Sequence, residues 1–123
     1  MTDLKLGEIE SRFAAIIWEN EPLSSRKLAE LSEQVLGWKK STTYTVLKRL
    51  CDHGLFQNQK GIVTSLLSKS ELCAMQSEKF VNETFDGSLP AFLAAFHSRK
   101  KLSASEIDTL QAMVEQMREQ CHD

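Results

Sequence analysis

The stretch Trp38-Lys-Lys-Ser-Thr-Thr-Tyr-Thr-Val-Leu-Lys-Arg-Leu-Cys-Asp-His-Gly-Leu55 decides how the rest of the sequence is interpreted. Gly54 follows its last apolar positions, and glycine commonly ends a helix because it adopts the left-handed conformation without a Cβ clash. An inward stripe at the spacing of one helical face is formed by Thr43, Val46, Leu47 and Leu50. The stretch therefore predicts an amphipathic helix from about Lys40 to His53.

The opposite face of this predicted helix carries hydroxyls, a tyrosine and cations. Hydroxyl and phenol groups can meet base edges in the major groove of DNA, and Lys and Arg can meet phosphates or guanine. An ordinary amphipathic surface helix has the same spacing, so this stretch alone leaves both interpretations open. The residues of this face are Ser41, Tyr44, Thr45, Lys48 and Asp52, with Arg49 at its edge.

The overall composition is that of a small globular protein with an uneven charge distribution. The chain has 123 residues, of which 41% are hydrophobic and 26% charged, and its net charge is −2. Residues 39–60 hold five cations and one carboxylate, which gives 5 − 1 = +4, whereas residues 68–123 hold six and nine, which gives −3. A basic patch on an acidic body is compatible with steered binding to a polyanion.

Cysteine usage and the lack of long apolar runs point to the cytoplasm. No stretch approaches the ~20 apolar residues that a membrane span needs, so no membrane partner is expected. The first seven residues lack the basic flank and apolar run of a signal peptide. Cys51, Cys73 and Cys121 are odd in number and widely spaced, which predicts free thiols in a reducing cytoplasm.

The sequence around the key helix fits a winged helix-turn-helix over residues 1–68. A first helix is expected from Glu8 to Glu19, and a second, capped by Ser24, precedes the key helix. After Gly54, two β-prone arms flank Lys60-Gly61, which predicts a hairpin, the wing, with Lys60 at its tip. The apolar side of the second helix consists of Leu28, Leu31 and Val35.

Residues 69–123 predict only helices, so the fold class is mostly α. Ser70 is the expected N-cap of the first helix, and Ser103 and Glu106 form a capping box for the last. About 55 residues seldom build a sufficient core alone. A second copy is the simplest partner, with folding back onto the first half as the alternative. The predicted dimer interface is Leu72, Met75, Phe80, Thr84, Phe85, Leu89, Phe92, Leu93, Phe96, Ile107, Leu110, Met113, Val114 and Met117.

Several blocks, taken in order, give the chain a family resemblance. They are Leu6-Gly-Glu-Ile-Glu10, Ile16-Ile-Trp18, residues 38–50, Gly54-Leu55, residues 80–89, Phe92-Leu-Ala-Ala-Phe96 and residues 102–107. Their order and spacing resemble the penicillinase and methicillin-resistance repressor family, which includes copper-responsive repressors. The resemblance implies a homodimeric transcriptional repressor that binds inverted repeats in promoters.

The resemblance also suggests how repression is relieved. Similar antibiotic-responsive repressors are cleaved in the first dimerisation helix in response to an upstream sensor protein, and the corresponding protease-sensitive site here is Lys79-Phe80. Those proteins usually place Asn before the Phe, and Lys79 at this position argues against cleavage by a cognate sensor protease. The copper branch ends in paired Cys-x-Cys motifs, whereas this chain has only Cys121-His122, which disfavours copper sensing and predicts no metal site.

The remaining function classes are an enzyme and a protein-interaction module. His53, His97 and His122 are scattered, and no catalytic triad or Gly-rich phosphate loop is present, so no catalytic residue and no cofactor are expected. A winged helix that binds protein instead of specific DNA stays the alternative to a repressor. The predicted DNA contacts are Lys39, Lys40, Ser41, Thr42, Tyr44, Thr45, Lys48, Arg49 and Lys60.

Overall fold

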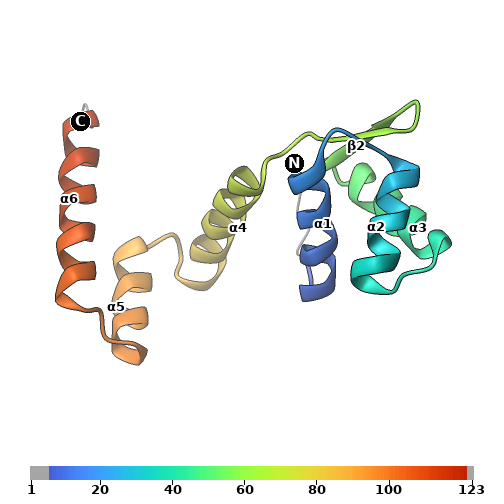
Figure 1. Cartoon of the computed structure of the whole chain (residues 1–123). Coiled ribbons are helices and arrows are strands. Elements are labelled where there is room, and N and C mark those ends of the chain that lie inside the picture. The colour runs from blue at the N-terminus through green and yellow to red at the C-terminus, as the bar shows by residue number, and fades with distance from the viewer. Residues whose placement is uncertain (1–5, 122–123) are drawn as a thin grey trace. The chain divides into compact units, whose positions relative to one another are not determined.

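The structure, a computed structural model (Figure 1), describes residues 6–121. The chain divides into two compact units, with the boundary between Ser77 and Glu78. The expected winged helix followed by further helices is confirmed. The boundary between the units falls inside a helix, whereas the sequence pattern predicts a boundary before it. The elements are α1 (Glu8–Asn20), β1 (Leu23–Ser24), α2 (Ser25–Leu36), α3 (Lys40–Asp52), β2 (Phe56–Gln59), β3 (Ile62–Ser65), α4 (Lys69–Thr84), α5 (Leu89–Arg99) and α6 (Ala104–Gln120).

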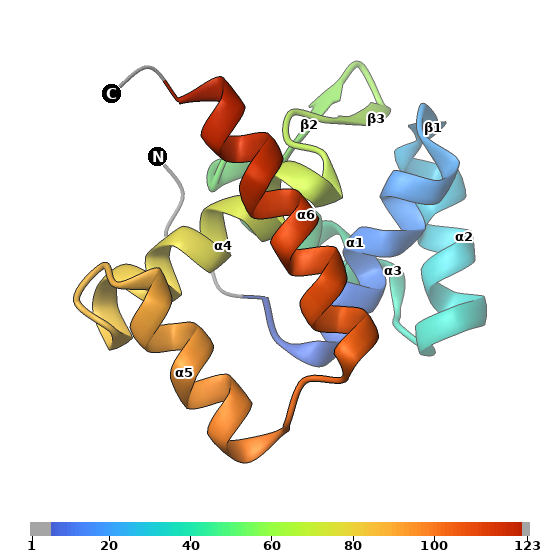
Figure 2. The same cartoon turned by 90° about the vertical axis from the view of Figure 1, so that its left-hand side faces the viewer.

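The first unit has one hydrophobic core, to which helices and a small antiparallel sheet both contribute. Figure 2 labels the three strands of this sheet. The strand order is β1-β3-β2, and Val63 on the central strand pairs with Leu23 on one side and Asn58 on the other. Helices and strands both supply buried apolar side chains, so the core is enclosed by elements of this unit alone. Its fully buried large side chains include Phe13, Ile17, Leu28, Leu50, Leu55, Phe56 and Val63.

The beginning of α4 belongs to this first core. Leu72, which the sequence pattern assigns to a dimer interface, is only 3% exposed and packs in the core cluster instead. The indole Nε1 of Trp18 donates a hydrogen bond of 3.0 Å to the carbonyl of Leu67, just before the helix starts. The helical period could not reveal this, because an apolar side chain facing its own core and one facing a partner have the same spacing.

Three local features of the first unit differ from the prediction. Val35 is 50% exposed, and Ala29 and Ser32 are buried on the inner side of α2 in its place. Ser68, rather than Ser70, caps α4: its hydroxyl accepts from the Glu71 amide while the Glu71 carboxylate accepts from the Ser68 amide. The two-residue strand β1 is not predicted at all, because it is too short to show a period.

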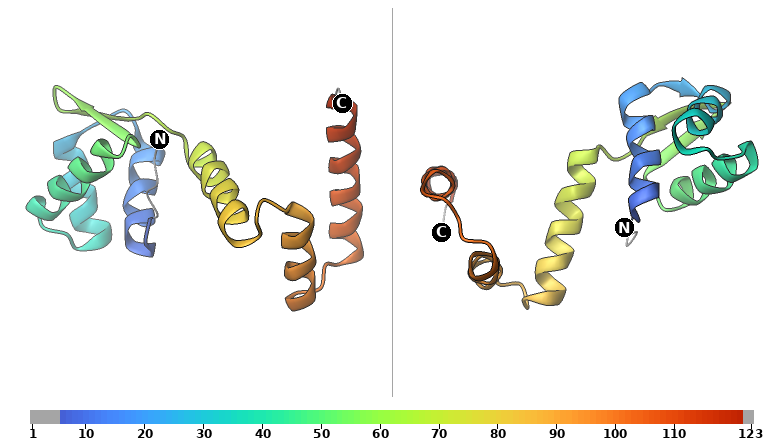
Figure 3. Two further views of the ribbon diagram at one scale, coloured as in Figure 1. Left: turned by 180° about the vertical axis from the view of Figure 1, so that it is seen from behind. Right: turned by 60° about the horizontal axis from the view of Figure 1, so that its bottom comes forward.

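The second unit consists of the end of α4 with α5 and α6, which Figure 3 shows as distinct helices joined by short connectors. Ser88 caps α5, and the predicted capping box of Ser103 and Glu106 opens α6. Four phenylalanines form a chain of ring contacts with centroids 5.6–6.2 Å apart, a favourable range for edge-to-face pairs. No residue of α5 or α6 is buried. The rings that make contact are Phe80, Phe85, Phe92 and Phe96.

Candidate DNA-binding surface

Helix α3 presents two different faces, as its sequence predicts. Leu47 and Leu50 are buried in the first core, Val46 packs partly against it, and the Thr43 side chain is completely inaccessible to solvent. The helix ends at Asp52, and Gly54 follows with φ of 84°, in the left-handed region that glycine adopts readily. The inner face therefore fixes which side chains of α3 point outward.

The outward face of α3 carries most of the predicted DNA contacts on an exposed surface. Every predicted contact residue is exposed except Arg49, which is half-buried. Tyr44, the one tyrosine of the chain, is 41% exposed. The exposed members are Lys39, Lys40, Ser41, Thr42, Tyr44, Thr45 and Lys48 on or beside α3, and Lys60 on the hairpin.

Lys48 is paired within α3 but stays accessible. Its Nζ lies 3.2 Å from the Asp52 carboxylate one turn later, and both side chains are well exposed. Such an i,i+4 pair in solvent is worth only about 0.3–0.5 kcal/mol, so a phosphate can displace the carboxylate at small cost. Asp52 therefore moderates the positive charge of this face without blocking it.

Arg49 points toward α1 and not toward the outward face. Its guanidinium forms an ion pair with the carboxylate of Glu10, and the two side chains are 41% and 22% exposed. The sequence pattern places Arg49 at the edge of the DNA-facing surface, but it cannot identify a partner that lies 39 positions away (49 − 10) in the chain. The structure thus brings together the other predicted contacts of α3 and sets this one apart.

The wing is a two-residue hairpin whose tip is Lys60-Gly61, as predicted. Lys60 has φ of 53° and Gly61 has φ of 82°, the pair of positive angles of a type I′ turn, which matches the twist of paired strands. The Gly61 carbonyl accepts a hydrogen bond of 2.8 Å from the Ser25 amide. This bond places the wing turn beside the first residue of α2.

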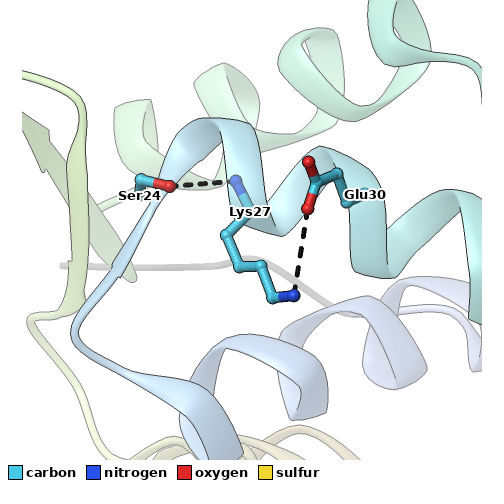
Figure 4. Close-up of polar contacts among 3 residues, drawn as sticks. All are labelled: Ser24, Lys27 and Glu30. Carbon is cyan, nitrogen blue, oxygen red and sulfur yellow. Dashed lines mark hydrogen bonds and ion pairs between the residues drawn. The ribbon is translucent and has the colours of Figure 1, made fainter.

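The start of α2 adds cations that the sequence pattern does not single out. Arg26 and Lys27 are exposed and directly follow Ser25. Figure 4 shows the Ser24 hydroxyl accepting from the Lys27 amide at 3.0 Å, while the Lys27 Nζ lies 3.8 Å from Glu30. In the sequence, the signal for these cations is their position in the first turn of a helix capped by Ser24. In the structure, the pairing of β1 with β3 brings the start of α2 next to the wing.

The helices of the second unit expose most of the predicted interface. Eight of its apolar side chains are at least 41% exposed, and no residue of α5 or α6 is buried. This is more exposed apolar surface than a small monomeric protein usually has. Thr84 is exposed as well, whereas Met75, Phe85, Phe92 and Leu110 are half-buried. The eight are Phe80, Leu89, Leu93, Phe96, Ile107, Met113, Val114 and Met117.

The predicted protease-sensitive bond lies within a helix. Lys79 and Phe80 are both exposed residues of α4, and Lys79 Nζ lies 4.0 Å from the Glu83 carboxylate. Phe80 packs against Phe85 and Phe92. A protease that binds an extended strand must therefore unwind this part of α4 before it can cut.

Metal ligands, reactive thiols and membrane-spanning helices are the features that would point to other functions among residues 6–121. Among residues 6–121 no group of three or more His, Cys, Asp or Glu side chains could hold a metal ion; His122 of the predicted Cys121-His122 pair lies outside them. Burial, followed by the neighbouring Asp52, raises the pKa of the Cys51 thiol, which disfavours its reactive thiolate form. No helix within these residues has the length and apolar character needed to cross a membrane.

Comparison with known proteins places this fold and surface in a family. The family model described as penicillinase repressor matches residues 6–116. The penicillinase repressor of Bacillus licheniformis is 22% identical over 116 residues, which cover 91% of each chain. The match extends over both units and includes α3, the wing, α5 and most of α6. The chain therefore belongs to the penicillinase repressor family, a family of winged-helix transcriptional repressors.

Proposed function

We propose that the protein represses transcription as a homodimer that binds an inverted-repeat operator through α3 and the wing. The observation that carries the proposal is the outward face of α3, where hydroxyls, Tyr44 and cations project from a helix whose other face is held in the core. A helix with such a face fits the major groove. The exposed Lys60 at the wing turn suits a phosphate beside that groove.

The side chains of this surface divide into two roles. Short hydroxyls and the tyrosine suit base edges, because they can donate or accept hydrogen bonds in a sequence-dependent way. Lysines suit phosphates, because their charge is attracted to every sequence equally. We assign Ser41, Thr42, Tyr44 and Thr45 to base edges and nearby phosphates, and Lys39, Lys40, Lys48 and Lys60 to the DNA backbone.

Dimerisation is supported by the apolar surface of the second unit. Exposed faces of α5 and α6 carry Leu93, Phe96, Val114 and Met117 among others, and two copies related by a two-fold axis would cover them. The two α3 helices of such a dimer are expected about one turn of DNA apart, ~34 Å, or a multiple of it. A palindromic operator and steric occlusion of the promoter follow.

Fluorescence anisotropy with the DNA upstream of the protein's own gene tests the proposal. The full chain is titrated onto this DNA and onto random DNA of equal length over a salt series. Tight binding to the upstream DNA, weak binding to random DNA and a steep fall with salt are expected. Equally weak binding to both contradicts the proposal and favours a winged helix that recognises protein.

Single substitutions separate the two roles. Lys48→Ala should weaken binding to all sequences and lower the salt slope by about one. Tyr44→Ala or Thr45→Ala should instead change the preference among operator variants. Lys100→Ala, which removes an exposed cation from the second unit, is the matched control and should change neither.

A further inference from the structure

We propose that Arg49 is a positioning residue, which orients the recognition helix through its ion pair with Glu10 and does not bind DNA itself. This inference rests on the proposed function, because it concerns how α3 is presented to an operator. The pair joins the last turn of α3 to the first turn of α1. It therefore connects the DNA-facing helix to an element on which none of the predicted DNA contacts lies.

Both partners are built into the structure around them. The second carboxylate oxygen of Glu10 accepts a hydrogen bond of 3.3 Å from the Gly7 amide at the N-cap of α1. On the other side, Arg49 lies in the last turn of α3, where a positive charge is favoured by the helix dipole. The hydrogen bond from Gly7 thus orients the Glu10 carboxylate, whose other oxygen pairs with the Arg49 guanidinium.

The ion pair complements a second contact between α1 and the start of α3. Trp38, two residues before α3, packs on Phe13 of α1 with ring centroids 5.0 Å apart. Glu10 and Phe13 are three residues apart and share one face of α1. Side chains of one helical turn of α1 thereby reach both ends of the recognition helix.

A directional contact at this place is useful because the apolar burial that holds α3 in the core is not directional. Leu47 and Leu50 bury apolar surface, and such burial alone depends little on orientation. The backbone of α3 packs most extensively against α2 and β2, and less against α1. A paired guanidinium fixes angle and distance, which base recognition requires to within about 0.5 Å.

The two roles open to Arg49 make opposite predictions for Glu10. If Arg49 binds a phosphate, Glu10 competes with the DNA, so Glu10→Gln should leave binding unchanged or strengthen it, and Arg49→Gln should lower the salt slope by about one. If Arg49 positions α3, the two substitutions should have the same effect and the salt slope should stay as it is.

The experiment measures the affinity of the full chain for upstream and random DNA over a salt series. The variants are Glu10→Gln, Arg49→Gln, the double variant and the exchange Glu10→Arg with Arg49→Glu; Lys48→Ala is the control for a lost phosphate contact. Each single variant and the double variant should lose about tenfold in operator affinity, as coupled contacts typically do, and little on random DNA. The exchange should recover a substantial part of the loss.

Several results would overturn the inference. A salt slope that falls by about one in Arg49→Gln, with Glu10→Gln binding as well as the wild type, assigns Arg49 to phosphate and overturns it. Thermal melting of both single variants below the assay temperature assigns the pair to folding alone and also overturns it. Wild-type protein that does not distinguish the two DNAs contradicts the proposed function itself, and this inference with it.

Discussion

The two units of this chain differ in how far they bury their apolar side chains. In the first unit, helices and a three-stranded sheet enclose a core whose large side chains are almost wholly inaccessible. In the second unit, the apolar side chains of α5 and α6 lie on helix surfaces and none is buried. The first unit therefore encloses its own core, whereas the second leaves large apolar side chains on its surface, where the proposed dimer would cover them.

The largest expected effect concerns the completeness of the first unit. Leu50 is fully buried, so Leu50→Ala should lower the free energy of unfolding by about 2–5 kcal/mol. Urea denaturation measures this loss, and Val35→Ala, at a 50% exposed position, is the control that should change little. A loss below about 1 kcal/mol would contradict a core closed within this unit.

The next effect tests the proposed dimer, which the second unit would form. Val114 is 53% exposed on α6, and Val114→Asp should raise the dissociation constant of a dimer at least about 100-fold, because an unpaired carboxylate is costly to bury. Sedimentation over a range of concentrations measures it. Gln116→Asp, an exposed polar position of the same helix, should leave the dimer intact. If both variants associate like the wild type, the partner covers another surface.

A smaller effect tests the packing of α3 in the first unit. The hydroxyl oxygens of Ser32 and Thr43 are buried and have no hydrogen-bond partner within the described residues. Thr43→Val keeps the shape and removes the unpaired hydroxyl, so stability should rise by about 1 kcal/mol. Thermal melting checks this, with Thr42→Val on the exposed side as the control. A loss of stability would indicate that a bound water satisfies the Thr43 hydroxyl.

The smallest effect concerns the capping box, a helix-starting motif that is present in both units. Hydrogen bonds from the amide and side chain of Ser68 lower the pKa of Glu71, and those of Ser103 lower the pKa of Glu106. Because each folded pKa lies below the ordinary 4.5, the stabilisation is present at neutral pH and is lost as the pH falls through the lowered value. Circular dichroism between pH 7 and 3, as a rough range, should show less pH dependence in Glu106→Gln than in the wild type. Identical curves for the two proteins would contradict a role for this carboxylate.

The sequence predicts the helices and strands of this protein better than it predicts which of them pack against one another. The stripe of α3, the wing turn and the capping box of Ser103 were all readable, because each depends on residues a few positions apart. Whether an apolar residue faces its own core or a partner depends on chain segments far away. That is why the sequence pattern predicts an interface position for Leu72, which belongs to the first core.

The candidate site follows the same rule. The exposed hydroxyls and cations of α3 could be predicted, since one helical period separates the outward face from the inward face. The pairing of Arg49 with Glu10 could not, because nothing local connects them. Likewise, the cations that begin α2 join the wing only through the pairing of β1 with β3, and a two-residue strand leaves no pattern.

The placement of the two tryptophans gives this protein a built-in optical label. Trp18, hydrogen-bonded to the Leu67 carbonyl, and Trp38, packed on Phe13, are the only tryptophans of the chain, and both belong to the first unit. Intrinsic emission excited at the red edge of indole absorption therefore reports this unit alone, while backbone dichroism sums over both. Unfolding curves recorded by the two methods on one sample will separate wherever the units lose their structure independently.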